Sequence, residues 1–200
     1  TWSVWGGDVY YYRNAKDSVS GKFYEFFRRK IIPRIPVITS FARGDFETVS
    51  EVYGTNARYL PCMYPLPVDF LNFKTEIKKE KGIFTILAGN SGNPSNNHTE
   101  ILRKLVPLKE KNIRIICPLS YSGNEGYIND VVSLGHDIFG DKLVPVHEII
   151  EPGRYLELLF SCDAAIMNHD RQQGLGNILP LLYFGKKVFL RAGTSSYSYL

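Results

Sequence analysis

The 200-residue chain has little of what marks several specialised classes of protein. Its longest apolar runs, such as residues 178–185, are about half of the ~18 residues that a membrane-spanning helix needs, which excludes a transmembrane protein. With only 3 cysteines it is not a disulfide-stapled miniprotein, and with 44% hydrophobic residues it is neither disordered nor collagen-like. The sequence therefore predicts a globular protein with room for one large domain, or for one domain and part of another.

The sequence also lacks the spacings that mark metal and cofactor sites. Cys62, Cys117 and Cys162 are odd in number, widely spaced and set among apolar neighbours, which predicts buried free thiols in a reducing compartment. There is no Cys-x-x-Cys, no paired histidine spacing and no Asp-x-Asp, and no secretory leader is visible. We therefore expect neither a bound metal nor a cofactor.

Positive charge is confined to one segment. The net charge is +4, but residues 13–34 hold seven lysines and arginines against two acidic residues, so the rest of the chain is slightly acidic. Because this segment carries no recognised nucleic-acid-binding motif, we expect no nucleic-acid partner.

From residue 82 onward, short β-branched runs alternate with helical stretches. The expected strands are residues 83–87, 113–117, 143–146, 164–167 and 188–190. The expected helices are residues 97–111, 125–134, 155–161 and 174–184. This alternation through short turns predicts an α/β fold, a parallel sheet with helices on both faces.

The part before residue 82 is less regular. Residues 23–32 and 44–52 are expected to be helical, and residues 37–41 and 59–63 to be strands. The chain is then stiffened by prolines and rich in lysine. We therefore predict a partial amino-terminal domain over 1–64, a linker over 65–81 and a complete second domain over 82–200.

The first of two glycine turns follows the expected strand 83–87. Gly89, Asn90, Ser91 and Gly92 stand just before a helix, whose free amides and positive dipole end suit a phosphate. Ser91 adds a hydroxyl, and Ser95 or Asn96 is a good N-cap. The turn lacks the Gly-x-Gly-x-x-Gly and Gly-Lys-Ser/Thr spacings, which disfavours nicotinamide-cofactor and P-loop sites. The alternative is a tight turn with no ligand.

The second glycine turn opens the last helix of the expected sheet. Arg171 supplies a planar, permanently charged fork for a diphosphate, or alternatively forms a surface salt bridge. Gln172 and Gln173 bind sugar hydroxyls or are solvated. The turn continues with Gly174, Leu175, Gly176 and Asn177. Both turns fall at the carboxyl ends of expected strands, where open α/β sheets bind ligands, so together they predict one nucleotide-sugar site.

The chain resembles glycosyltransferases of the GT-B fold, and most specifically glycosyltransferase family 56. The resemblance rests on the order of elements in Tyr155–Leu190, on Ile86–Gly92 with Ser95–His98, on Arg171–Gly176 and on Trp5–Asp8. This is the 4-alpha-L-fucosyltransferase group, whose bacterial members move N-acetylfucosamine (a 4-acetamido-4,6-dideoxyhexose) from a TDP-sugar to a lipid-linked precursor of a surface polysaccharide, the enterobacterial common antigen.

The resemblance implies a fold, an activity and a location. It implies a complete carboxyl-terminal Rossmann-like domain and part of an amino-terminal one. It also implies a metal-independent hexosyltransferase, peripheral at the cytoplasmic face of the bacterial inner membrane. Many GT-B enzymes carry carboxylates where this chain has Gln173 and residues 181–183. The chain therefore lacks a glutamate that would bind a ribose 2′-hydroxyl. This absence implies either a deoxyribose nucleotide such as TDP or a sugar moiety that is bound by other residues.

Asp8 is the candidate catalytic base. It lies in a glycine-rich loop beside Trp2 and Trp5, where apolar neighbours raise a carboxyl pKa and suit it to deprotonate an acceptor hydroxyl. The alternative is an aspartate that caps a helix or bonds the backbone of a turn.

Three further side chains, Tyr121, Glu148 and His98, are candidates near the expected ligand site. Tyr121 stacks on the nucleotide base or is a plain surface aromatic. Glu148 lies in the loop after the third strand of the sheet, and in GT-B enzymes this loop commonly approaches the nucleotide base. His98 reaches a phosphate or is a solvated helix residue. His169, like His136, has no partner at ligand spacing and is assigned no role.

The basic segment combines aromatics with cations. At helical spacing Phe23 and Phe27 share one face, while Arg28, Arg29 and Lys30 lie around the other sides. This pattern predicts docking on an anionic membrane surface, where a lipid-linked acceptor diffuses. The alternative is a core helix with a solvated basic rim. For the whole chain the alternative to an enzyme is a noncatalytic nucleotide-sugar-binding or partner-docking domain.

Overall fold

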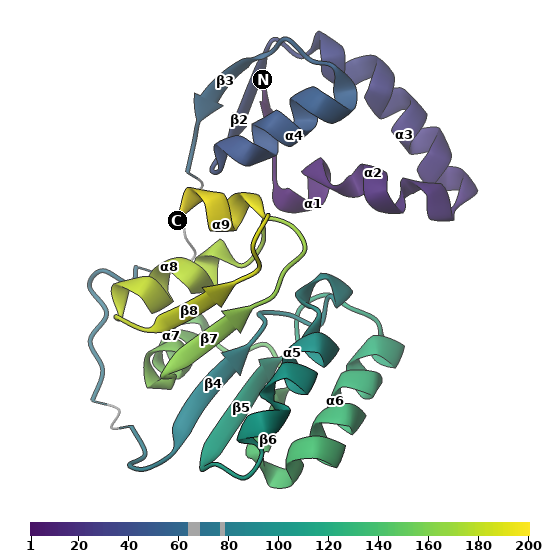
Figure 1. Ribbon diagram of the computed structural model, residues 1–200. Coiled ribbons are helices and arrows are strands. Elements are labelled where there is room, and N and C mark those ends of the chain that lie inside the picture. The colour runs from purple at the N-terminus through teal and green to yellow at the C-terminus, as the bar shows by residue number, and fades with distance from the viewer. Residues whose placement is uncertain (64–68, 77–78) are drawn as a thin grey trace. The chain divides into compact units, whose positions relative to one another are not determined.

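The computed structural model describes residues 1–63, 69–76 and 79–200, which form two compact units (Figure 1). The first unit holds residues 1–63 together with Arg171–Gln173 and Ala192–Leu200. The second holds the described residues from 69 to 170 and Gly174–Arg191. The sequence assigned all of 82–200 to one domain, so the division in the structure differs at 171–173 and at 192–200.

The second unit contains a five-stranded sheet in which every described pair of neighbours is parallel. Its strand order is β6-β5-β4-β7-β8. The strands are β4 (Phe84–Ala88), β5 (Ile113–Pro118), β6 (Leu143–Val146), β7 (Ala164–Met167) and β8 (Lys187–Leu190). The predicted parallel α/β sheet is confirmed.

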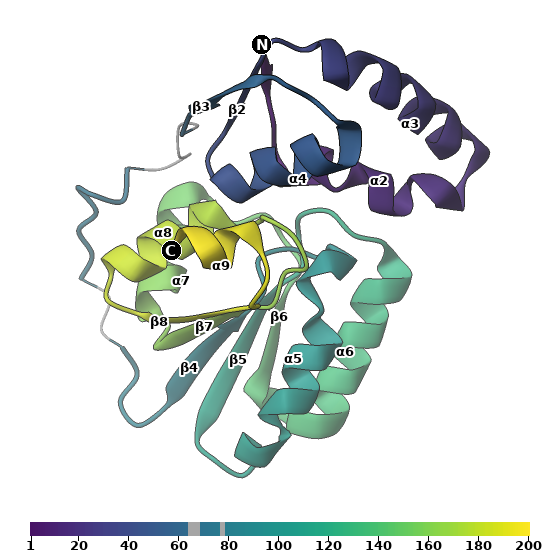
Figure 2. The ribbon, with the colours of Figure 1, turned by 45° about the horizontal axis from the view of Figure 1, so that its top comes forward.

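Helices cover both faces of this sheet. They are α5 (His98–Leu105), α6 (Glu125–Phe139), α7 (Pro152–Ser161) and α8 (Leu175–Tyr183). The strand order doubles back after β6, so right-handed crossovers place α5 and α6 on one face and α7 and α8 on the other (Figure 2). A core cluster of the second unit lies between β4, β5 and the helices α5 and α6.

Two helix boundaries differ from the predicted ones for local reasons. Helix α5 ends at Leu105 rather than near 111, because Pro107 lacks the amide hydrogen that a helix needs and a short 3-10 turn, Val106–Leu108, follows. Helix α6 continues past 134 to Phe139. Its Gly135 lies against Leu143, so closely that a Cβ would come within 2.5 Å of Leu143 Cδ2. The glycine there serves close packing and does not end the helix.

The described part of the predicted linker packs on the second unit. The Phe73 ring lies 5.4 Å from that of Phe184, and the Tyr183 hydroxyl donates a hydrogen bond to the Leu71 carbonyl at 3.1 Å. Residues 64–68 and 77–78 lie outside the described residues. Residues 69–76 are thus bound to α8 rather than free of it.

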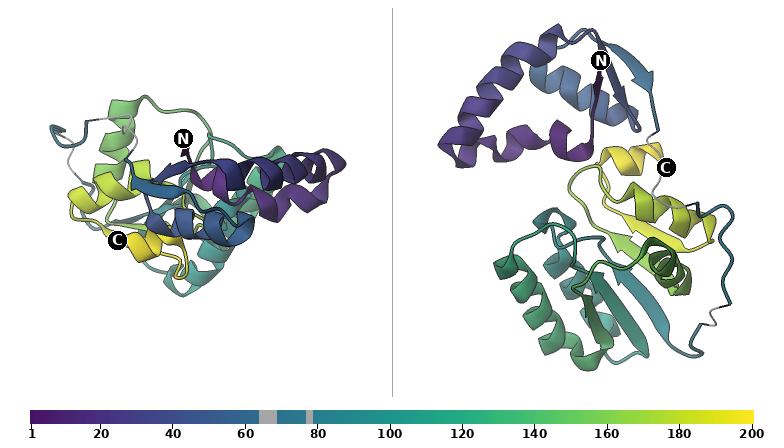
Figure 3. Two further views of the ribbon diagram at one scale, coloured as in Figure 1. Left: turned by 90° about the horizontal axis from the view of Figure 1, so that it is seen from above. Right: turned by 180° about the vertical axis from the view of Figure 1, so that it is seen from behind.

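The first unit has a three-stranded parallel sheet, ordered β1-β2-β3. Its strands are β1 (Trp2–Ser3), β2 (Val37–Ser40) and β3 (Arg58–Pro61), and its helices before β3 are α1 (Gly6–Val9), α2 (Tyr11–Asn14), α3 (Val19–Ile31) and α4 (Arg43–Tyr53). The chain reverses between α2 and α3, as Figure 3 shows from behind. Strands β2 and β3 and helices α3 and α4 were predicted; β1, α1 and α2 were missed because two to four residues show no periodicity.

Residues 192–200 join the first unit through α9 (Ser195–Tyr199). The Ser195 hydroxyl donates to Asp45 Oδ1 at 2.6 Å, and the rings of Phe41 and Tyr199 lie 4.3 Å apart. Burial raises the pKa of Asp45 to about 6, against the opposing effect of its hydrogen bonds from Ser195 and Tyr10. These contacts fasten α9 to the start of α4, and they explain why 192–200 does not belong with the second unit.

The thiols agree with the prediction at two of three positions. Cys117 and Cys162 are buried and free, and burial raises the pKa of each to about 12. Cys62 is exposed just after β3, so the prediction of a buried thiol is wrong there. Its apolar neighbours in sequence point away from any core because β3 itself is largely exposed.

Candidate functional site

Loops from four strands meet at the carboxyl edge of the second unit's sheet. Because all five strands run in parallel, the segments that follow β4, β5, β6 and β7 start from the same edge. The first glycine turn is bound to this edge by its Gly89 amide, which donates to the Ile166 carbonyl of β7 at 2.9 Å. The predicted position of the site at this edge is therefore present in the fold.

Asn96 is the polar centre of the first turn. It is completely buried, and its Oδ1 accepts from the Asn90 amide at 2.9 Å and lies 2.9 Å from His169 Nε2. Its Nδ2 donates to Ser91 Oγ at 3.1 Å and to the Asn93 carbonyl at 2.9 Å. Because Oδ1 only accepts, His169 Nε2 is the donor. One side chain thus joins the turn after β4 to the segment after β7.

The predicted helix cap at Ser95 or Asn96 is wrong. Asn97, with φ of 52°, stands at the N-cap of α5 and makes no side-chain capping bond there. The side chain of Asn93 instead accepts from the Ser95 amide and caps the 3-10 turn Pro94–Asn96. Asn96 binds the turn itself because its side chain points into the interior.

Glycines at both turns lie against buried histidines. Gly89 has a φ of 71°, and a Cβ there would come within 2.4 Å of His98 Nε2. Gly174 has a φ of 73°, and a Cβ there would lie 2.7 Å from His169 Cε1. A Cβ on Gly176, in contrast, would meet nothing within 4 Å. The first two glycines are required by packing, and the third leaves space at the start of α8.

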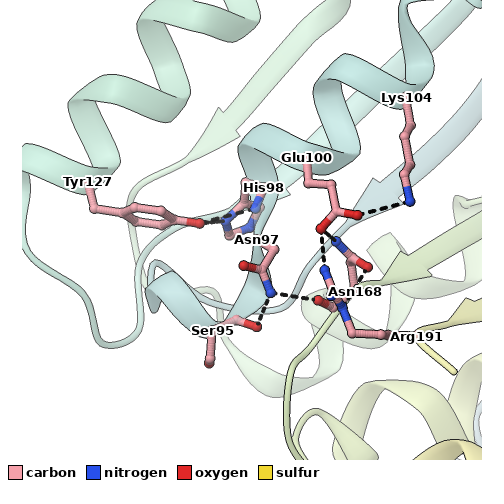
Figure 4. A network of polar contacts seen from close by, with 8 residues as sticks. All are labelled: Ser95, Asn97, His98, Glu100, Lys104, Tyr127, Asn168 and Arg191. Atoms are coloured by element: carbon pink, nitrogen blue, oxygen red, sulfur yellow. Dashed lines mark hydrogen bonds and ion pairs between the residues drawn. The ribbon is translucent and has the colours of Figure 1, made fainter. Parts of the chain in front are cut away.

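His98 is fully buried, so the alternative of a solvated helix histidine is wrong. Its amide and its Nδ1 both lie within hydrogen-bond distance of the Tyr127 hydroxyl, at 3.1 and 3.0 Å (Figure 4). Burial lowers its pKa to about 4, opposed by a weaker effect of the Ala88 backbone. The imidazole is therefore neutral at pH 7 and supports the turn beside Gly89.

A second polar network joins the segment after β4 to the segment after β7 (Figure 4). Asn97 Nδ2 donates to the Asn168 carbonyl at 3.0 Å, and Asn168 Nδ2 donates to Glu100 Oε2 at 2.9 Å. Glu100 also pairs with Lys104 and Arg191, and the hydrogen bond from Lys104 is the main reason that its pKa falls to about 2. Nothing in the sequence singled out this network, which lies beside a cavity of about 250 Å³ between α5, β7 and β8.

The loop after β5 braces the first turn. The Gly92 amide donates to the Tyr121 carbonyl at 3.1 Å, and Asn93 Nδ2 donates to Ser122 Oγ at 3.1 Å. The Tyr121 side chain is 71% exposed next to the turn, and Glu148 is exposed in the loop after β6. Both are on the carboxyl edge, where a ligand would reach them.

Two predicted ligand residues of the second unit hold the protein together instead. Ser91 is buried, and its hydroxyl accepts the bond from Asn96. Asn177 is also buried, and its Nδ2 donates to the Tyr155 hydroxyl at 2.8 Å, which joins α8 to α7. Burial raises the pKa of that Tyr155 hydroxyl, which keeps it neutral.

Within the first unit, the short helix α1 meets Arg171–Gln173. The Gly6 amide donates to Gln172 Oε1 at 3.1 Å, and a Cβ on Gly6 would lie 1.8 Å from the Gln172 carbonyl oxygen. A Cβ on Gly7 would lie 3.8 Å from the Arg171 guanidinium. Gln172 is buried, so its predicted contact with a sugar is replaced by this bond to α1.

Asp8 lies in α1, half-buried. Its Oδ2 accepts from the Trp5 amide at 3.2 Å, which is the capping bond that the sequence offered as the alternative to catalysis. The carboxylate is thus oriented by the backbone and stands in the same unit as Arg171. The capping bond and a role as base are compatible, because the second carboxylate oxygen is a separate acceptor.

Helix α3 exposes its aromatics and buries a charged pair. Phe23 is 67% exposed and Phe27 43%, so the alternative of a core helix is wrong for them. Arg28 is wrong as a docking residue: its side chain is 10% exposed and faces inward with Glu25. Arg29 and Lys30 are exposed, as predicted. No helix among the described residues is long and apolar enough to cross a membrane.

Among the described residues, no three or more His, Cys, Asp and Glu side chains group as a metal site would require.

Comparison with solved structures identifies the fold. A glycosyltransferase from Rickettsia africae matches with a TM-score of 0.63 at 12% identity, over 86% of this chain and 48% of that one. UDP-forming alpha,alpha-trehalose-phosphate synthases from Burkholderia vietnamiensis and Burkholderia xenovorans match with TM-scores of 0.62 and 0.60, at 9% and 10% identity. They are matched over 85% and 82% of this chain and 48% and 47% of theirs. The chain has a partial GT-B fold and spans about half the length of these structures.

A family model describes the sequence more specifically than the fold does. The model of the 4-alpha-L-fucosyltransferase glycosyl transferase group 56 matches residues 1–193, which include α1, both glycine turns and all eight strands of the described residues. The chain belongs to this family, glycosyltransferase group 56.

Proposed function

We propose that the protein is a glycosyltransferase that moves N-acetylfucosamine from a TDP-sugar to a lipid-linked saccharide in bacterial surface polysaccharide synthesis. The observation that carries the proposal is the cradle at the carboxyl edge of the second unit. There Asn96 joins the first glycine turn to His169. His169 lies five residues before Gly174, the N-cap of α8, and there is open space at Gly176 in the first turn of that helix. Membership of group 56 supports a fucosyltransferase-type enzyme.

The donor's diphosphate is proposed to bind at the start of α8. The first amides of a helix have no partners within it and lie at its positive dipole end. Gly176 leaves room for a phosphate oxygen. Arg171 is proposed to bind the same anion, because it stands only three residues before Gly174 in the chain and carries a permanently charged fork. Gln173 and Asn90 are proposed to contact the sugar.

The nucleotide base is proposed to lie against Tyr121, with Glu148 nearby. Tyr121 offers a largely exposed ring on the carboxyl edge, and Glu148 stands exposed in the next loop of that edge. Since Gln173 and residues 181–183 stand where many GT-B enzymes carry carboxylates, the chain lacks a glutamate for a ribose 2′-hydroxyl, and we expect TDP to bind more tightly than UDP.

The transfer needs one base and one stabiliser of the leaving group. Asp8 accepts the proton of the acceptor hydroxyl as its oxygen forms a bond to the anomeric carbon of the sugar. The bond from that carbon to the diphosphate oxygen breaks, and TDP leaves with the electron pair. Arg171 and the start of α8 stabilise the charge that develops, and the lack of an Asp-x-Asp pair supports a reaction without metal.

A donor assay with the full-length protein tests this proposal. TDP-N-acetylfucosamine is incubated with the protein and a lipid-linked acceptor, with EDTA present, and the released TDP and the glycosylated lipid are measured. Matching amounts of both products support the proposal. TDP binding without transfer or donor hydrolysis would identify a noncatalytic nucleotide-sugar-binding domain, and activity that requires Mg²⁺ or Mn²⁺ would contradict the metal-independent step.

Replacing Arg171 by alanine is expected to weaken TDP binding by about 1.5–3 kcal/mol, roughly 10- to 150-fold in Kd, because a charge-assisted hydrogen bond to phosphate is lost. Calorimetric titration of the wild-type and variant proteins with TDP measures this change. Arg103→Ala is the matched control, since it removes an exposed arginine from the last turn of α5. Equal TDP affinity of the Arg171 variant and the wild type would contradict the assignment.

Helix α3 is proposed to dock the protein on an anionic membrane, where the lipid-linked acceptor resides. Its outward surface carries a ridge of apolar side chains. The exposed members are Val19, Phe23, Tyr24, Phe26, Phe27 and Ile31. Lys22, Arg29, Lys30 and Arg34 are exposed around this ridge. Aromatics inserted at headgroup depth between cations are typical of an interfacial helix. The proposed location is thus peripheral, at the cytoplasmic face of the inner membrane.

The combined change Lys22→Glu and Lys30→Glu is expected to weaken binding to anionic vesicles by at least about 30-fold, because each cation near acidic headgroups contributes about 1 kcal/mol. Sedimentation with phosphatidylglycerol vesicles at low salt measures the bound fraction. The pair Lys109→Glu and Lys111→Glu, on the second unit, is the control with the same change in charge. Equal binding of both pairs, or no binding by the folded wild-type protein, would contradict docking through α3.

A further inference from the structure

The buried stripe of α3 contains an ion pair where an apolar stripe is usual. Gly21, Glu25, Arg28 and Ile32 follow one another at helical spacing and are the residues that α3 and the turn after it turn inward. Arg28 Nε lies 3.3 Å from Glu25 Oε2, and the two side chains are only 10% and 11% exposed. A buried ion pair is expensive to desolvate and contributes little net stability, so its presence calls for another explanation.

Arg28 donates hydrogen bonds to the backbone of α1 and to Tyr53 of α4. One terminal nitrogen donates to the Asp8 carbonyl oxygen at 2.6 Å, and the guanidinium also donates to the Tyr53 hydroxyl at 3.1–3.2 Å. Tyr53 in turn donates to Glu25 Oε2 at 3.1 Å. Glu25 and Tyr53 therefore fix the plane of the guanidinium from two sides.

Aromatic rings close the remaining space around this cation. The Arg28 guanidinium carbon lies 5.5 Å from the ring centre of Trp2, 5.3 Å from that of Tyr11 and 5.9 Å from that of Tyr24. Each ring attracts the cation through its quadrupole and excludes water from it. The bond to the Asp8 carbonyl is thus made by a charge with little freedom to move.

Helix α1 needs such outside support. It has four residues, and a single turn is unstable by itself because nucleation is unfavourable. Besides the packing of Val9 in the core, two hydrogen bonds hold it: Gln172 accepts from the Gly6 amide at its start, and Arg28 donates to the Asp8 carbonyl near its end. A cation at the carboxyl end of a helix also complements the helix dipole. Both contacts bear on the turn that carries the Asp8 carboxylate.

We propose that Arg28, oriented by Glu25 and Tyr53, is the positioning residue of the base: it fixes α1 through the Asp8 carbonyl and thereby aims the Asp8 carboxylate at the acceptor hydroxyl. Arg28 touches no substrate in this role. The inference rests on the proposed function, in which Asp8 is the base. It also explains why one arginine of the basic helix α3 is buried while its neighbours are exposed.

Steady-state kinetics of the full-length protein test this role. Arg28→Gln is expected to lower kcat about 10- to 100-fold, since a base displaced by about 1 Å loses rate on that scale. The donor KM is expected to change by less than about twofold, because no donor contact is removed. Arg28→Lys, which keeps the charge, should regain part of kcat. Arg43→Gln, an exposed arginine paired with Glu47, is the control that leaves both constants unchanged.

Amide hydrogen exchange provides a readout that does not depend on activity. In Arg28→Gln the amides of residues 6–10 are expected to exchange faster than in the wild type, while those of β2 stay protected. If the single variant does not fold, Glu25→Gln with Arg28→Met removes both charges together and is measured in its place. If exchange becomes faster throughout the first unit and kcat falls by a matching extent, Arg28 only stabilises the unit, and the proposal is overturned.

The outcomes separate this role from the proposed function. Full kcat in every folded Arg28 variant overturns the positioning role alone, because the enzyme then works without it. Absence of transfer by the unaltered protein overturns the proposed function and this role with it.

Discussion

Asp8→Asn is expected to lower kcat by about 10²- to 10⁴-fold in the full-length enzyme, because an amide cannot accept the proton of the acceptor hydroxyl. Donor affinity should stay close to that of the wild type, since Asp8 is not among the residues proposed to bind the donor. Asparagine keeps an oxygen that can accept from the Trp5 amide, so the capping bond at the start of α1 survives the change.

Thermal melting separates catalysis from capping. If Asp8 is the base, Asp8→Asn has the same melting temperature as the wild type and is nearly inactive. If Asp8 only caps α1, Asp8→Asn stays active, while Asp8→Ala loses stability by about 1 kcal/mol. Asp17→Asn is the matched control, because Asp17 is an exposed aspartate in the 3-10 turn after α2. Wild-type turnover of Asp8→Asn, measured per folded molecule, would rule out the base.

Asn96→Leu is expected to destabilise the protein by about 3–5 kcal/mol, because it removes four hydrogen bonds of a fully buried side chain at once. The Asn90 amide and His169 Nε2 lose an acceptor, and Ser91 Oγ and the Asn93 carbonyl lose a donor. For a chain of this size the melting temperature should fall by roughly 6–20 °C. Chemical denaturation and thermal melting measure both quantities.

A graded series checks the cause. Asn96→Asp keeps the acceptor for Asn90 and His169 but loses the donor group, so its stability should lie between those of the wild type and Asn96→Leu. Asn112→Leu removes an exposed asparagine that bonds the Gly82 carbonyl, and it should change stability by less than about 1 kcal/mol. A loss below about 1 kcal/mol for Asn96→Leu would show that the two segments do not depend on this side chain.

The order of elements in the second unit could be predicted because each element leaves a local pattern. The bounds of β6 and β7 agree with the prediction residue by residue, since both are short apolar runs between clear turns. The first unit was harder to predict. Strand β1 has two residues and α1 four, and such elements owe their form to partners distant in sequence, such as Ile38 for Trp2.

The site could be predicted as an edge of the sheet but not as a set of contacts. Both glycine turns were found from their composition. The bond from His169 to Asn96, however, joins residues 73 positions apart, and no local spacing announces it. A histidine at the start of a helix gives the same pattern whether it is solvated or buried, so the burial of His98 could not be read from the sequence.

The buried face of helix α3 could not be predicted from the sequence either. Its aromatic spacing was found, but the spacing of Glu25 and Arg28 at i and i+3 is also that of a common surface pair. Only the structure shows that Gly21 leaves room beside the Ala15 carbonyl and turns this stripe inward, because a Cβ there would lie 2.7 Å from that oxygen. Which side of an amphipathic helix is buried depends on the neighbours that it meets.

The return of residues 192–200 to the first unit has a consequence for synthesis of the chain. Asp45 and Tyr10 emerge early, but Ser195, which donates to the buried Asp45 carboxylate, is made about 130 residues after the end of β3. At about 5–20 residues per second this delay is on the order of 10 s. Over that interval the ribosome delivers the whole second unit, which is able to fold first. The first unit, most of which is translated before the second, is thus completed only after it.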